Sequence, residues 1–376
     1  MAASAPRVIS VEQAKRHLLS HLGLRKARPE KGVAGLEGLI EQLGCVQLDP
    51  LDRIGENADL VALARVDGVK RGQLTEHLLG AGQAFEHFYK ERCLLPRAFF
   101  AQYRAHLRTS DWWQFWGQLE IPTDSVIEDV LAEVTARGRV AAGDLLDRGR
   151  GKRLSAGQSN AIPSLSRLAV EILWSRCQVV VCGRSSKGKL YELAERVFPE
   201  FYNTAPDADF GRWSVVQRTR SAGLLSVNAG PNWSLLSKQR TALVALAVQE
   251  GLVELVQVEG HKRRYLAPLR FLEQESDEDD GRTRIIGPLD PLMWDRNLVA
   301  HLFGFEYVWE VYKPPAQRKW GYYVCPILQG GELVGRFEGR RGDGRIVVES
   351  LWMQDGARLD EAAWAEALER HWCAQG

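Results

Sequence analysis

Long hydrophobic runs are absent from this 376-residue sequence. No stretch approaches the roughly 18 consecutive apolar residues that a membrane-spanning helix needs. The opening residues, MAASAPRVIS, also lack the apolar core of a secretion signal. We therefore expect a cytosolic protein, and its length allows about two to four small domains.

Cysteine is sparse and scattered. None of the six cysteines belongs to a C-x-x-C pair, and none has a histidine at the spacing of zinc ligands. This pattern excludes the common zinc and iron–sulfur motifs, so we expect buried free thiols and neither a metal nor a cofactor. The six are Cys45, Cys93, Cys177, Cys182, Cys325 and Cys373.

An excess of positive charge is also missing, since the net charge is only +1. This value alone argues against a nucleic-acid partner, because most nucleic-acid-binding domains are clearly basic. However, the run EQESDEDD (273–280) holds six carboxylates, which leaves the rest of the chain at +7. A run of this kind is typical of a solvated, mobile linker and marks a domain boundary.

Helical signals open the chain. Ser10 and Gln13 have the spacing of a capping box, which predicts a helix within 9–24. A second, shorter helix is predicted over 35–44, ending at Gly44 as a left-handed cap. Residues 69–107 are predicted to be largely helical.

VQLDP follows the second helix directly. In an extended segment, Gln47 and Asp49 face one side while Val46 and Leu48 face the other, which we expect to be the core. Pro50 stops the strand. Taken alone, the pair is also explained by turn chemistry, with Asp49 capping the next turn and Gln47 solvated.

One plan recurs along the chain. Residues 125–147 predict a helix, a turn at Gly138 and a short second helix, and 164–199 predict a longer helix followed by a two-stranded wing. This is the order of a winged helix-turn-helix. It repeats over 213–268, where the wing turns at Glu259 and Gly260, and we count 7–66 as the first copy.

The texture changes after the acidic run. Short strands are predicted at YVWEVYK, GYYVCPILQ, ELVGRFEGRR and RIVVESLWM, followed by a final helix, which suggests a small β-barrel or sandwich. Before this region, the cluster DWWQFWGQ (111–118) is expected to be a packing joint between subdomains.

The predicted fold class is therefore α+β, with three winged helices and a small β-barrel-like domain. The predicted domains are a first winged helix with connecting helices (1–120), a second (121–207), a third (208–272), the acidic linker (273–283) and a C-terminal β-domain with its final helix (284–376).

This organisation resembles the AlkZ and YcaQ superfamily of bacterial winged-helix DNA glycosylases. The similarity covers nearly the whole chain and is carried by VQLDP, by FEHFYKERCLLP (85–96) and by the passage from PLDPLMWDRN to ELVGRF (288–337). The family motif is Q-x-Q in the AlkZ branch and Q-x-D in the YcaQ branch. Gln47 and Asp49 match the second branch, which implies base excision repair of N7-alkylated guanines and unhooking of interstrand crosslinks. The chain departs from the family pattern in lacking a histidine in IGENADL (54–60) and in having Lys90 near another histidine position.

The chemistry of base release fits the pair. Cleavage of an N-glycosidic bond passes through an oxocarbenium-like state, which a carboxylate stabilises. An N7-alkylated purine is already cationic and leaves without protonation. Asp49 would polarise the attacking water, and Gln47 would orient the water or the sugar. No lysine neighbours the pair in the sequence, so we expect a monofunctional glycosylase without a Schiff base.

Duplex DNA carrying alkylated bases or crosslinks is the expected partner, bound by the protein as a monomer. Basic residues around the second module and on the third wing could contact phosphates, although exposed charges are also ordinary surface. They are Arg137, Arg139, Arg148, Arg150, Lys152, Arg153, His261, Lys262, Arg263 and Arg264.

A non-catalytic winged-helix transcriptional regulator is the alternative. Regulators usually add a dimerisation helix or a ligand domain, whereas here three modules share one chain. No positive feature supports a purely structural protein.

Overall fold

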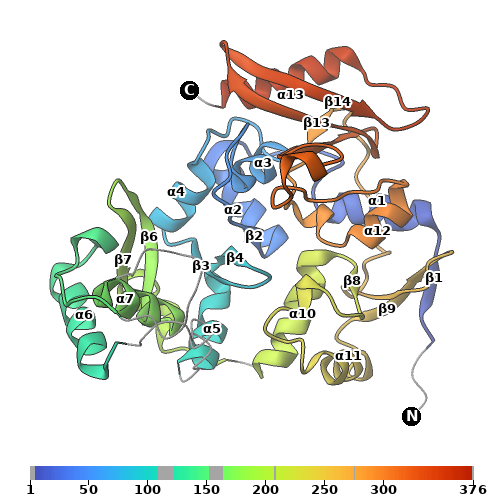
Figure 1. The fold of residues 1–376 in the computed structure, drawn as a ribbon. Helices are drawn as coiled ribbons and strands as arrows, with labels where there is room; N and C mark the ends of the chain where they lie inside the picture. Colours follow the sequence, from blue (N-terminus) through green and yellow to red (C-terminus); the bar gives the residue numbers. More distant parts are fainter. Residues whose placement is uncertain (1–4, 109–121, 152–163, 207–208, 275, 375–376) are drawn as a thin grey trace. The chain divides into compact units, whose positions relative to one another are not determined.

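The computed structural model of the chain (Figure 1) divides into two compact units. The described residues are 5–108, 122–151, 164–206, 209–274 and 276–374. The predicted aromatic joint at 111–118 lies outside them. The first unit comprises Met1–Leu74, Phe88–Leu94 and Gly211–Gly376, and the second comprises Thr75–His87 and Leu95–Phe210. The four domain boundaries expected from the sequence stay predictions.

The beginning of the first unit follows local sequence signals. Helix α1 (Val11–His21) starts with the capping box, in which Ser10 accepts from the Gln13 amide and the Gln13 side chain accepts from the Ser10 amide. Helix α2 (Gly32–Leu43) ends at Gly44, whose φ of 63° suits a residue without a Cβ. Both expectations are confirmed. Strand β2 (Val46–Gln47) and helix α3 (Asn57–Leu63) follow.

The expectation of helix throughout 69–107 is wrong in its middle part. Two strands occupy this region between helices. Four of the five residues of AFEHF are buried, and the segment has neither a helical nor an alternating apolar pattern that would identify a strand in the sequence. The elements are α4 (Gln73–Gly80), β3 (Ala84–Phe88), β4 (Arg92–Pro96), η1 (Arg97–Phe99) and α5 (Phe100–Leu107). Strand β2 pairs antiparallel with β4, Gln47 opposite Cys93.

A four-stranded sheet joins distant parts of the first unit. Its order is β1-β9-β10-β8, and β1 (Arg7–Ile9) runs parallel to β9 (Glu254–Val258). The predicted hairpin between β9 and β10 (Arg264–Ala267) is present, with Gly260 at φ 72°. The N-terminal strand thus completes this sheet and pairs with no strand within 7–66. The remaining elements of this region are α10 (Phe210–Ala222), β8 (Leu225–Ser226), η4 (Pro231–Trp233) and α11 (Arg240–Gln249).

The acidic run, which the sequence predicts to be a solvated, mobile linker, is attached at its end. The Asp280 carboxylate accepts from Arg284 at 2.6 and 2.8 Å and from the Ala27 amide at 2.9 Å. Arg25 also donates to the Asp277 carbonyl at 2.6 Å. The Asp280 carboxylate therefore holds this end of the acidic run against Ala27 and Arg284.

The C-terminal sheet is open, so the expected closed barrel is wrong. Its order is β11-β12-β13-β14, and within the described residues β14 does not return to β11. Helix α13 lies beside β14 (Figure 1) and also contacts β11. The rings of Trp364 and Phe337 pack edge-on with their centres 4.9 Å apart. YVWEVYK is irregular instead of a strand. The elements are β11 (Arg284–Ile285), η5 (Pro291–Met293), α12 (Arg296–Phe303), η6 (Pro315–Gln317), β12 (Val324–Gln329), β13 (Glu332–Gly342), β14 (Arg345–Met353) and α13 (Glu361–Cys373).

The second unit contains a three-stranded sheet of order β5-β7-β6. The predicted turn at Gly138, with φ 72°, separates α6 from β5, and the predicted two-stranded wing is formed by β6 and β7. The elements are α6 (Asp124–Arg137), β5 (Val140–Ala141), η3 (Ala142–Asp144), α7 (Leu165–Ser175), β6 (Val179–Ser185), β7 (Gly188–Leu193), α8 (Ala194–Val197) and α9 (Pro199–Tyr202). No helix in the described ranges is both long and apolar enough to span a bilayer.

Candidate active site

Gln47 is held at the end of β2 by groups from distant parts of the first unit. Gln47 is only 6% exposed, which differs from the alternative interpretation of the pair, in which this amide is solvated. Lys90 Nζ donates to Gln47 Oε1 at 2.9 Å. Asn57 Nδ2 donates to the Gln47 carbonyl oxygen, also at 2.9 Å. The amide and the backbone of Gln47 are therefore both fixed.

Asp49 lies just beyond the strand, and both Leu48 and Asp49 are partly exposed. The expected alternation is thus wrong at Leu48, which is not fully buried. Asp49 Oδ1 accepts from the Leu51 amide at 3.0 Å, which is the turn-capping contact considered from the sequence. Among the described residues, Oδ2 has no hydrogen-bond partner. One carboxylate oxygen orients the side chain, and the other remains available.

Asn57 connects VQLDP to the segment that begins PLDPLMWDRN (288–297). Its Nδ2 also reaches the Leu289 carbonyl at 3.4 Å, and its Oδ1 accepts from the Leu289 amide at 3.2 Å. Asn57 is fully buried. A Cβ at Gly287 would lie 2.7 Å from Asn57 Oδ1, so glycine permits this close approach.

A buried ion pair anchors the same segment. Arg65 Nη1 and Nη2 donate to the two carboxylate oxygens of Asp290 at 2.7 and 2.9 Å, and both side chains have 0% exposure. Arg65 also donates to the carbonyls of Leu22 and Val61. Such bidentate pairing satisfies charges that would be costly to bury alone.

Trp294 also belongs to this segment, and its ring lies next to Lys90. Its indole N–H donates to the Leu289 carbonyl at 2.8 Å, which fixes the ring. Lys90 Nζ lies 5.2 Å from the centre of that ring, within the range of a cation–π contact. Lys90 therefore lies between Gln47 and Trp294.

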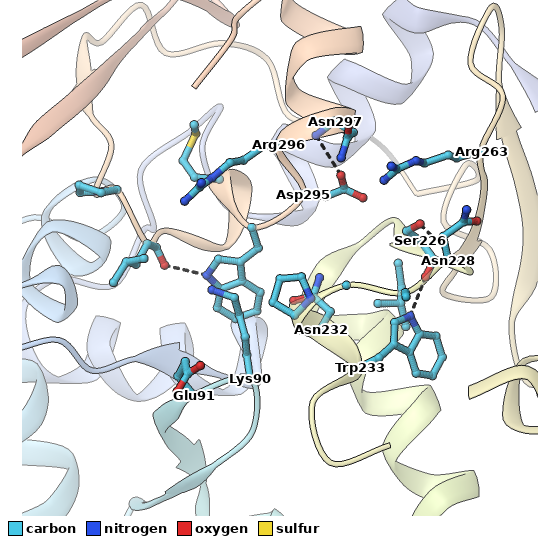
Figure 2. Close-up of a pocket in the computed structure, with 18 residues that line it drawn as sticks. Lys90, Glu91, Ser226, Asn228, Asn232, Trp233, Arg263, Asp295, Arg296 and Asn297 are labelled. Atoms are coloured by element: carbon cyan, nitrogen blue, oxygen red, sulfur yellow. Dashed lines mark hydrogen bonds between the residues drawn. The ribbon is translucent and has the colours of Figure 1, made fainter. Parts of the chain in front are cut away.

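A pocket of about 440 Å³ lies beside Lys90. Figure 2 shows Arg263 and Asp295 reaching toward each other in the upper part of this pocket, with Asn232 below them. The lining mixes three cationic and two anionic side chains with two tryptophans, a chemistry suited to a charged nucleotide. The charged groups are Lys90, Arg263, Arg296, Glu91 and Asp295.

Arg218 binds two backbone segments that carry residues of the pocket lining. This α10 side chain is 1% exposed and donates to the Tyr89 carbonyl at 3.1 Å and to the Asn232 carbonyl. Its guanidinium also lies 4.3 Å from the centre of the Tyr89 ring. The turn that carries Lys90 and the loop that carries Asn232 are thereby tied to one group.

Burial lowers the pKa of Lys90 below its ordinary value of 10.5. Cys93, Cys45 and Glu91 oppose this shift, and Arg296 adds to it. The described part of the chain contains no cluster of three His, Cys, Asp or Glu side chains that could hold a metal. The cysteines in it are free; five are buried as expected, and Cys373 is exposed.

The predicted phosphate contacts have different environments. Arg137 pairs with Glu133, and Arg148 pairs with the same carboxylate at 2.7 Å. Arg139 and Arg150 are exposed. Lys152 and Arg153 lie outside the described residues.

On the third wing, Lys262 and Arg264 are exposed, while half-buried Arg263 lines the pocket. A hydrogen bond of 2.8 Å between His301 Nε2 and the Glu259 carbonyl links the wing tip to α12. The ring of His261, a candidate phosphate contact from the sequence, lies 4.5 Å from that of His301.

Sequence reasoning missed Lys90, Asn57, Trp294 and the Arg65–Asp290 pair as parts of one site. The passages FEHFYKERCLLP and PLDPLMWDRN contain several of these residues, but nothing in their spacing shows that they meet VQLDP.

The chain belongs to the AlkZ-like family of DNA glycosylases, whose sequence model, DNA glycosylase AlkZ-like, matches residues 40–372. The resemblance noted from VQLDP and the two longer passages is thus confirmed. The structure is also similar to that of the Streptomyces sahachiroi DNA glycosylase AlkZ, with a TM-score of 0.58. This match covers 97% of the present chain and 96% of that chain at 16% sequence identity, so it concerns the mixed α/β fold alone.

Proposed function

We propose that the protein is a DNA repair enzyme that hydrolyses the N-glycosidic bond of N7-alkylated purines and unhooks interstrand crosslinks. The family supports base release from DNA, and the Q-x-D pair supports the lesion class. The same bond is cleaved whether the N7 substituent is a small alkyl group or a tether to the other strand. The observation that carries the proposal is the hydrogen bond to Gln47 from Lys90, a residue that also lines a charged pocket.

Gln47 acts as a donor toward the reacting groups. A lysine side chain has no acceptor when it is charged, so the hydrogen bond from Lys90 assigns the oxygen of the Gln47 amide to that side. The amide nitrogen has no acceptor among the described residues. It would donate to the attacking water or to a sugar oxygen, and polarisation by Lys90 strengthens that donation.

Asp49 supplies the negative charge. Its Oδ2 would stabilise the oxocarbenium-like sugar and accept a proton from the water, while the Leu51 contact keeps the carboxylate in place. The cationic base departs as a neutral purine, so this step needs no general acid.

The pocket charges suit the parts of an alkylated nucleotide. Arg263 and Arg296 would contact phosphate oxygens, and Asp295 and Glu91 would offset the positive base. Asp295 is oriented by the amides of Asn297 and Leu298 at 3.1 Å each.

We further propose that the chain forms three tandem winged helices and acts as a monomer on duplex DNA. This activity takes place in the cytosol, where the protein is associated with the nucleoid. The order α6, η3, α7, β6, β7 supports the second module, and α10, α11, β9, β10 supports the third. The first stays a proposal from the sequence.

The decisive test is single-turnover release of N7-methylguanine from duplex DNA by wild type and by Asp49→Asn, beside equilibrium DNA affinity. Removing the charge should slow release by about 10²-fold or more while binding survives. Release should persist in EDTA; loss in EDTA with recovery on adding a divalent ion would indicate metal-dependent chemistry. If both proteins bind DNA and neither releases a base, the regulator alternative is correct.

A further inference from the structure

Lys90 differs from every other buried or half-buried lysine among the described residues. Lys15 pairs with Glu12 and Glu332, Lys189 with Glu171, and Lys313 with Glu310. In the same part of the chain, Lys90 has no carboxylate within ion-pair distance, and its Nζ contacts the neutral Gln47 amide and the Trp294 ring.

This environment corrects the premise that excluded a lyase. The sequence places no lysine next to Gln47, but the fold places Lys90 Nζ 2.9 Å from Gln47 Oε1, across 43 positions of the chain. The same side chain lines the pocket. One side chain thus both lines a cavity of about 440 Å³ and ends beside the proposed catalytic amide.

We propose that Lys90 is a nucleophile that forms a Schiff base with the abasic sugar and cleaves the strand on its 3′ side. This second activity rests on the proposed function for the entry of the sugar into the pocket. It requires a lysine whose amine is uncharged for part of the time. Burial favours the uncharged form, because it lowers the pKa of Lys90.

The steps balance without a redox partner. After base release, the sugar hemiacetal opens to an aldehyde at C1′. The Lys90 amine adds to C1′ and water leaves, giving a protonated imine. A pocket carboxylate, Glu91 or Asp295, then takes a proton from C2′, and the electron pair expels the 3′-phosphate. Hydrolysis of the imine restores Lys90 and releases an unsaturated aldehyde.

The test uses the full-length protein and duplex DNA with a preformed abasic site, so base release is not required. Sodium cyanoborohydride should reduce the imine and leave a covalent protein–DNA adduct. Peptide mass spectrometry of the wild-type adduct should place the link on Lys90. An adduct on another lysine or on the N-terminal amine, or no adduct at all, would overturn the proposal.

Lys90→Arg keeps a donor beside Gln47 but removes the nucleophilic amine. Its adduct yield should fall on the order of 100-fold, as expected for loss of the nucleophile itself. Lys70→Arg is the matched control, because Lys70 is exposed and outside the site, and it should trap like wild type. Circular dichroism checks the fold of both variants, and the wild-type mapping decides the question even if Lys90→Arg is unfolded.

The two proposals fail separately. Release of N7-methylguanine without trapping on abasic DNA would leave the glycosylase proposal standing and remove the lyase. Trapping on abasic DNA without base release from methylated DNA would leave the lyase proposal standing and remove the glycosylase.

Discussion

Arg65 and Asp290 form a bidentate ion pair in which neither side chain reaches solvent. The pair joins the end of α3 to the segment that leads into Trp294 and the pocket. It therefore couples the stability of the first unit to the geometry of the site.

Asp290→Ala should destabilise the protein by about 3–5 kcal/mol, because it leaves the Arg65 guanidinium buried without its counter-ion. Arg65→Met with Asp290→Leu removes both charges and should recover much of that loss. Urea unfolding at neutral pH measures both. If the single variant is as stable as wild type, the pair does not hold the segment.

Asn57→Ala should slow base release although Asn57 is fully buried. The change removes the contacts that hold the Gln47 carbonyl and Leu289, so Gln47 would lose its alignment. We expect a loss of about 10-fold or more in single-turnover rate, since small displacements of catalytic groups have large effects. Gln47→Ala should also slow release, and the double variant should lose less than the product of the two. Multiplicative losses would show that Asn57 acts elsewhere.

The third wing should separate binding from pocket function. Lys262→Ala with Arg264→Ala should weaken DNA binding and reduce its salt slope by about one to two phosphate contacts. Arg263→Ala should chiefly reduce single-turnover base release, because Arg263 lines the pocket. Fluorescence anisotropy at several salt concentrations checks the first result, and excision at saturating protein checks the second. Equal behaviour of the two variants would contradict this division.

Glu310 should make stability depend on acid pH. Burial raises the pKa of its carboxyl, but hydrogen bonds from Lys313 and the Lys319 and Trp320 amides outweigh burial and lower the pKa to about 2. Since the folded pKa is below the ordinary 4.5, this stabilisation is complete above pH 4.5 and is lost as the pH falls toward 2. Glu310→Gln should lower the free energy of unfolding at pH 7 by about 1.5–3 kcal/mol and flatten the acid limb. Urea titrations from pH 7 to pH 3 measure it.

Local signals in the sequence identified structure that depends on neighbouring residues. Ser10 with Gln13, and Gly44 after α2, act within one helical turn, and both were predictable. YVWEVYK has the composition of a strand, yet Glu310 in it accepts backbone amides of a later loop, so side-chain contacts replace a ladder. That replacement depends on the three-dimensional fold.

The site was predictable only in part for the same reason. Gln47 and Asp49 are two residues apart and were recognised together. Lys90 meets Gln47 only because β2 pairs with β4, and Trp294 joins them through Leu289 and Asn57. No periodicity or spacing in the sequence records such contacts.

The parallel pairing of β1 with β9 has a consequence for the order of folding. Arg7 lies opposite Val256, so the first strand has no partner until the chain has been synthesised past that point. At about 5–20 residues per second, the wait is on the order of ten seconds or more, during which the second unit can form. The first unit therefore closes late and through distant contacts, which makes it the slower of the two to fold. Until then β1 is an unpaired strand that is open to association with other chains.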